Sequence, residues 1–155
     1  MITLTAAVLT ITAYVTGDDP PQLTLTAPPT GPGASAPPCT VVRGTATLAE
    51  GMALFVAVRR KPGLSRPKTI RFYRVDATRA STTWDVPISL DAANPEMSGE
   101  WYSIWALSVS AEWADFLEKV DGTTDGPLVI ASAMPPHEGE APSINVQRGA
   151  GQGSC

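Results

Sequence analysis

Side chains that perform catalysis or bind metals are scarce in this 155-residue chain, which has one histidine and two cysteines. A Ser-His-Asp triad would have to use His137, and no Gly-x-Ser-x-Gly motif accompanies it. Cys39 and Cys155 alone are too few for zinc, which needs three or four ligands. Phosphate-binding glycine motifs are also missing. We therefore expect no enzymatic activity, no cofactor and no metal.

Positive charge is limited as well, because the net charge is −4 and the pI is about 4.9. Nucleic-acid-binding domains usually have a basic stripe and a high pI, so we expect no nucleic-acid partner. Most of the basic residues nevertheless cluster between positions 59 and 74. This cluster could dock an acidic partner, an anionic polymer or lipid headgroups. A solvated hairpin loop is the simpler interpretation, because long basic side chains normally stay in water.

The two cysteines allow two interpretations. A disulfide between Cys39 and Cys155 is possible if the chain is exported, because disulfides persist in oxidising compartments. Two unpaired thiols are the simpler expectation. Residues 149–155, which precede and include the terminal Cys155, are rich in glycine, and we expect this tail to be disordered.

Residues 1–16 carry no charged side chain, but a membrane helix needs about 20 apolar residues. They also lack the basic residue that normally begins a signal peptide. They could be the end of a membrane or export segment. Since the first basic residue is Arg43 and basic flanks stay in the cytoplasm, the rest would then lie outside. The alternative is a β-strand, because Ile2 and Leu4 alternate with threonines, or a disordered tail.

Residues 17–38 are rich in proline and resemble a linker, within which Gln22–Thr26 alternates like a short first edge strand. The domain that follows, 39–148, shows strand patterns throughout. The strongest is at 99–109, where aromatic and β-branched residues suit a half-buried sheet. In the strand expected at 39–48, the small residues Gly44 and Ala46 would let a bulky neighbour, plausibly a tryptophan, pack closely. We expect strands at 39–48, 54–58, 69–75, 83–90, 99–109 and 143–148, and a shorter one at 128–131.

One amphipathic helix interrupts the strands. Ser110 is a suitable N-cap for a helix over 111–120, and Asp121-Gly122 supplies a stop. Its apolar residues are Trp113, Phe116, Leu117 and Val120, which fall on one helical stripe. We expect this stripe to cover Trp101 and Trp105, which share one face of the central strand.

Several short motifs support a resemblance over roughly residues 22–148. They are Val42-Arg43-Gly44-Thr45-Ala46-Thr47-Leu48, Gly51 to Arg59, Trp84, Gly99 to Ala106, and Ile144 to Arg148. The succession resembles the immunoglobulin-like β-sandwich modules of bacterial cell-surface and exported proteins, although the Cys…Trp…Cys pattern of antibody domains is missing. The resemblance implies an all-β, antiparallel immunoglobulin-like sandwich of about seven strands. The amphipathic helix expected at 110–121 is an insertion that many such sandwiches lack. It implies a recognition or accessory module and no catalytic residue.

The candidate contact residues are therefore aromatic and basic. If exposed, Trp101 and Trp105 would form a stacking platform for sugars or a protein. The basic candidates are Arg59, Arg60, Lys61 and Arg66. We expect a non-enzymatic interaction or spacer module on a proline-rich stalk, located outside the cytoplasm. If residues 1–16 span a membrane, they would attach the module to it. The expected partner is a protein or a cell-envelope polymer. The alternatives are a carbohydrate-binding module and a cytoplasmic adaptor domain.

Overall fold

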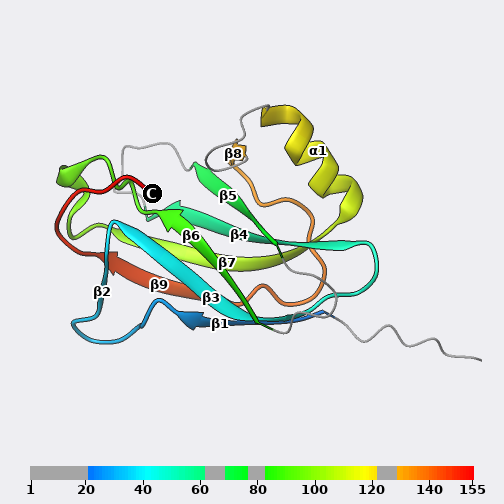
Figure 1. Ribbon diagram of the computed structural model, residues 1–155, viewed down its shortest axis with the longest axis horizontal. Helices are drawn as coiled ribbons and strands as arrows, with labels where there is room; N and C mark the ends of the chain where they lie inside the picture. The colour runs from blue at the N-terminus through cyan, green and yellow to red at the C-terminus, as the bar shows by residue number, and fades with distance from the viewer. Residues whose placement is uncertain (1–20, 62–68, 77–82, 122–128) are drawn as a thin grey trace, which may run out of the picture.

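The computed structural model describes residues 21–61, 69–76, 83–121 and 129–155, which form two β-sheets and one α-helix (Figure 1). The strands are β1 (Gln22–Ala27), β2 (Ser35–Ala36), β3 (Cys39–Thr47), β4 (Met52–Arg60), β5 (Ile70–Val75), β6 (Thr83–Ser89), β7 (Trp101–Ser110), β8 (Val129–Ala131) and β9 (Ser143–Arg148). The 3-10 helix η1 (Pro95–Met97) precedes β7, and α1 (Ala111–Asp121) follows it. The expected hydrophobic segment at 1–16 and the candidate Arg66 lie outside the described residues. Within these residues, no helix is long and apolar enough to cross a membrane.

The smaller sheet has the order β1-β3-β6, and the larger sheet has the order β2-β9-β7-β4-β5-β8. All pairs are antiparallel except β2 with β9. The larger sheet is a curled half-barrel. The expected all-β class is confirmed, and so is the edge position of the Pro87 strand, because β6 pairs only with β3 among the described strands.

The main core lies between the two sheets. On β6, the buried Trp84, Val86 and Ile88 alternate with exposed residues, as the sequence predicted. The larger sheet contributes most of the other side chains, among them Leu54, Val56, Val58, Tyr73, Tyr102, Ile104, Ala106 and Val146. The expected close packing of a tryptophan on the second strand is also confirmed. A Cβ atom on Gly44 would lie 2.5 Å from Cζ2 of Trp84.

A second core lies on the other face of the larger sheet, beneath α1. It contains Phe55, Ala57, Ile70, Phe72, Leu107, Val109, Ala114 and Leu117. The predicted helix cap is confirmed, because the Trp113 backbone N–H donates to Ser110 Oγ over 3.4 Å. The predicted buried stripe is wrong in its orientation. Its members Trp113 and Phe116 are exposed, whereas Leu117, which was predicted, and Ala114, which was not, are buried. Because α1 begins directly after β7, the strand direction fixes which helix face meets the sheet.

The C-terminal tail is fixed to the body of the protein. Cys39 and Cys155 form a disulfide, so the expectation of two unpaired thiols is wrong. The Gly153 N–H donates to the Ala92 carbonyl over 3.0 Å, and the guanidinium of the buried Arg148 donates to carbonyls of the tail. The expected disorder of 149–155 is therefore not observed. A glycine-rich composition favours flexibility only where no covalent or hydrogen-bonded anchor holds the segment.

Candidate functional site

The outer face of the larger sheet is only partly covered by α1 and the segment after β8. Antiparallel register places Arg59 opposite Ser103, and Ser103 opposite Asn145. The Lys61 N–H donates to the Trp101 carbonyl over 2.8 Å, which extends the register by one position. Because side chains alternate along a strand, residues at every second position share this face. We define the open face as Arg59, Lys61, Trp101, Trp105, Ser143, Asn145 and Gln147; Ser103 lies between them on the same side of β7 but is itself buried.

The two tryptophans of the open face differ in exposure. Trp101 is 44% exposed, whereas Trp105 is half-buried and packs against the second core. The expectation that the helix covers both tryptophans is therefore wrong. The helix lies over the half of the sheet that contains Phe55 and Leu107, which follows from its direct continuation of β7. Trp101, at the opposite end of β7 from the helix, keeps an exposed ring.

Arg59 stacks on Trp105. Its guanidinium carbon lies 5.1 Å from the centre of the tryptophan ring, which is a cation–π distance. Arg59 Nε has no hydrogen-bond partner. Within the described residues, the contact with Trp105 is therefore the interaction that orients this guanidinium.

The basic residues predicted to act together are divided between two faces. Arg60, at the last position of β4, points away from the open face, and its guanidinium contacts the sulfur of Met97 in η1. Arg59 and Arg60 lie in the strand, so the predicted basic loop begins only at Lys61. The structure therefore brings Arg59 and Lys61 together with the tryptophans and leaves Arg60 on the other side.

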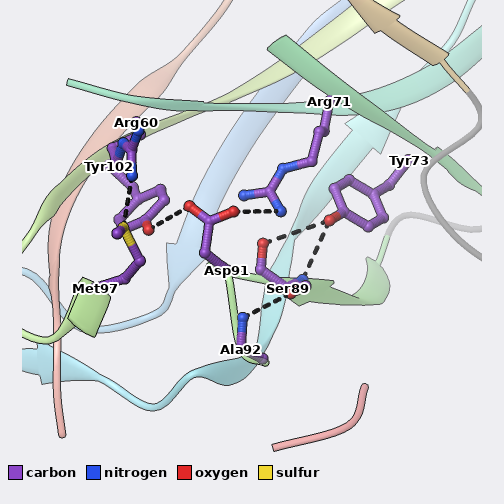
Figure 2. Close-up of polar contacts among 8 residues, drawn as sticks. All are labelled: Arg60, Arg71, Tyr73, Ser89, Asp91, Ala92, Met97 and Tyr102. Carbon is purple, nitrogen blue, oxygen red and sulfur yellow. Dashed lines mark hydrogen bonds and ion pairs between the residues drawn. The ribbon is translucent and has the colours of Figure 1, made fainter. Parts of the chain in front are cut away.

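Behind the open face, a polar cluster centres on Asp91, in the loop that leaves the smaller sheet (Figure 2). The Tyr102 hydroxyl donates to Asp91 Oδ2 over 2.7 Å, and the Arg71 guanidinium lies 3.1 Å from Asp91 Oδ1. Asp91 has a φ of 53°, a left-handed conformation that aspartate tolerates better than most residues. One carboxylate therefore joins β5, β7 and the loop after β6.

A second pair of contacts strengthens the same junction. The Ser89 N–H donates to the Tyr73 hydroxyl over 3.2 Å, and Ser89 Oγ accepts from the Ala92 N–H over 3.0 Å. Figure 2 shows Tyr73, Ser89 and Ala92 beside the Asp91 cluster. Since Tyr73 belongs to the larger sheet and Ser89 to the smaller, the bond between them connects the sheets at one end, and the bond between Ala92 and Ser89 holds the loop after β6. No sequence motif identified this cluster.

The Asp91 cluster is suited to structural support. Burial, reinforced by the hydrogen bond to Asp91, raises the pKa of Tyr102 well above its usual range. The phenol therefore remains a neutral donor. Arg71 and Tyr102 both engage the Asp91 carboxylate directly.

His137 is exposed, and its Nδ1 lies 3.1 Å from the Pro135 carbonyl in its own loop. Among the described residues, no group of three or more His, Cys, Asp and Glu side chains could hold a metal ion.

A second apolar surface lies on α1. Trp113 and Phe116 are 38% and 55% exposed, and their rings meet edge to face with centres 5.5 Å apart. Together with Glu112 they line a shallow groove. The sequence pattern predicted both aromatics as buried, so it did not indicate this surface.

Comparison with known proteins returns no matching family model, no matching curated protein and no matching solved structure.

Proposed function

We propose that the chain is a non-enzymatic, immunoglobulin-like recognition module that binds its partner through the open face. The observation that carries this proposal is the exposed Trp101 on β7, a strand in the interior of the larger sheet. A large aromatic side chain costs free energy when it stays in contact with water, and such residues are common at interfaces. The adjacent Arg59 and Lys61 add charge and hydrogen-bond donors to the same surface.

The immunoglobulin-like assignment has two lines of support. The orders β1-β3-β6 and β9-β7-β4-β5 correspond to the A-B-E and G-F-C-C′ arrangements of such sandwiches. The Tyr102 hydroxyl also bonds to Asp91 across the loop that joins the two sheets. This contact resembles the tyrosine corner, in which a tyrosine near the start of strand F bonds back to the preceding loop. Here the acceptor is a side-chain carboxylate where the corner normally uses the backbone.

The proposed location is extracytoplasmic, with residues 1–16 as a membrane or export segment. The Cys39–Cys155 disulfide supports this location, because such bonds are rare in the cytoplasm. The test is to quench intact cells with acid, alkylate free thiols with a maleimide after transfer to a neutral denaturing buffer, and measure the mass of the chain. An unalkylated, oxidised pair is the expected result. Two alkylated thiols would favour the cytoplasmic adaptor.

The proposed contact surface is tested by sedimenting the full chain with the envelope fraction of its own cells. Trp101→Ala should reduce the bound fraction strongly. Trp113→Ala is the matched control, because it removes an equally large and similarly exposed ring from α1, away from the open face. Equal binding by wild type and Trp101→Ala would reject the open face, and selective loss in Trp113→Ala would place the contact on the helix.

A carbohydrate-binding function is the second candidate, and it is favoured by the exposed amide of Asn145 on the same face as the exposed Trp101. Sugars present flat apolar faces that stack on aromatic rings, while their hydroxyls bond to amides and charged groups. The open face offers both kinds of contact.

A further inference from the structure

We propose that the ligand of the open face is an acidic glycan, an oligosaccharide whose sugar units carry carboxylate or phosphate groups. This inference rests on the proposed function and specifies its partner. Three features of the open face support it: the spacing of its rings, its charge, and the hydrogen-bond donors that remain unused.

The distance from the exposed Trp101 to the guanidinium of Arg59, which lies over Trp105, indicates an elongated ligand. Trp101 and Trp105 are four residues apart on one strand, which corresponds to about 13 Å at the usual rise of a β-strand. Between them the register places the buried Ser103, with Arg59 on one side and the exposed Asn145 on the other. A ligand stacked on Trp101 that also reaches the Arg59 guanidinium must therefore extend along β7 over a polar row. A chain of sugar rings has this alternation of flat apolar faces and polar edges.

The charge of the open face is entirely positive, although the whole chain has a net charge of −4. Arg59 and Lys61 are its charged residues, and their side chains have no ion pair or hydrogen bond within the described part of the chain. Lys61 is exposed beside Trp101. Because Arg59 is oriented by Trp105 before any ligand arrives, it would lose little conformational freedom on binding. This surface complements an anion.

The polar residues add donors suited to sugar oxygens. Asn145 Oδ1 accepts a hydrogen bond from Ser103 Oγ over 2.7 Å, which leaves the amide N–H groups for a ligand. The Gln147 amide nitrogen donates one hydrogen to the Gly99 carbonyl over 3.0 Å, and its second hydrogen remains. An acidic peptide would use the two cations but would not need the stacking surface of Trp101. We therefore favour the acidic glycan.

The experiment titrates the full chain with oligogalacturonate, with its methyl ester, and with a phosphorylated mannan oligosaccharide, by calorimetry at low and high salt. Polyglutamate is the acidic probe without sugar rings. We expect one or both acidic glycans to bind, and added salt to weaken the binding. The methyl ester, which keeps the sugars and loses the charges, should bind at least about tenfold more weakly. Whichever acidic glycan binds identifies carboxylate or phosphate as the recognised group.

Variants connect the binding to named residues. Trp101→Ala and Lys61→Gln should each weaken acidic-glycan binding by about tenfold, while Trp113→Ala should bind like the wild type. Circular dichroism of each variant checks that it is folded. A fall in affinity for Trp113→Ala alone would overturn the assignment to the open face.

Each remaining outcome separates this inference from the proposed function. Equal binding of ester and acid, with loss in Trp101→Ala, would overturn the acidic glycan but keep the open face as a binding surface for neutral sugars. Equal binding of polyglutamate would overturn it in favour of an acidic peptide. No binding of any glycan would overturn the inference, and the envelope sedimentation above would then decide the proposed function alone.

Discussion

The contact between Gly44 and Trp84 gives the sharpest test of the packing between the sheets. A Cβ atom on Gly44 would lie 2.5 and 2.9 Å from Cζ2 and Cε2 of Trp84 and would also collide with the carbonyl oxygen of Thr24. Real Cβ atoms do not approach other atoms so closely, so a neighbour would have to move. The carbonyl belongs to β1, whose pairing with β3 holds it in place, and Trp84 is 5% exposed.

Gly44→Ala should therefore lower the free energy of unfolding by about 3 kcal/mol, the upper end of the usual cost of overpacking. With a urea dependence of about 1–3 kcal/mol per M, the midpoint should fall by about 1–3 M. The sign is as informative as the magnitude. In a strand with room for a methyl group, replacing glycine by alanine would stabilise the fold by about 0.5–1 kcal/mol. Urea unfolding followed by circular dichroism measures the difference.

Thr47→Ala is the control, because Thr47 lies on the same strand, β3, and is exposed. This variant should change the free energy of unfolding by less than about 1 kcal/mol. A double-mutant cycle with Trp84→Phe then separates the two collisions. Gly44→Ala should cost less in the Trp84→Phe background, with a coupling energy of about 0.5–3 kcal/mol. If Gly44→Ala raises the urea midpoint, the packing argument is refuted.

Three further predictions concern the other features of the fold. Asp91→Ala removes the acceptor of the buried Tyr102 hydroxyl and should lower the free energy of unfolding, measured with urea, by about 2–4 kcal/mol. If the losses of Asp91→Ala and Tyr102→Phe simply add in the double variant, the two side chains do not interact. Reducing the Cys39–Cys155 bond, whose cysteines are 116 positions apart, should cost about 2–5 kcal/mol, and an unchanged melting temperature with reductant would contradict the closed tail. Trp113→Ala should change stability by less than about 1 kcal/mol, and a large loss in thermal unfolding would show that this ring is buried.

Strand periodicity allowed much of the fold to be predicted. Alternation in β6 identified Trp84, Val86 and Ile88 as buried, and the apolar run of β4 identified an interior strand. These predictions succeed because the two faces of a strand depend only on the order of neighbouring residues. The same alternation placed Trp101 and Trp105 on one face of β7, so the sequence alone indicated the tryptophan pair of the candidate site.

Features that depend on distant contacts could not be predicted in this way. The amphipathic stripe of α1 was compatible with several rotations about the helix axis, and the junction with β7 selects the one that buries Leu117. The Asp91 cluster joins Arg71, Asp91 and Tyr102 from three separate segments. Nothing local marks these residues as partners, because only strand pairing and the loop between the sheets bring them together.

The two faces of β7 explain why a binding surface can lie on a strand here. Tyr102 is fully buried and bonded to Asp91, while its neighbour Trp101 points to the opposite, exposed face. The contacts that hold Tyr102 therefore also fix the backbone that presents Trp101. A ligand that stacks on a ring fixed in this way orders few additional groups, so little conformational entropy is lost on binding. For this reason the same strand can contribute to both the core and the open face.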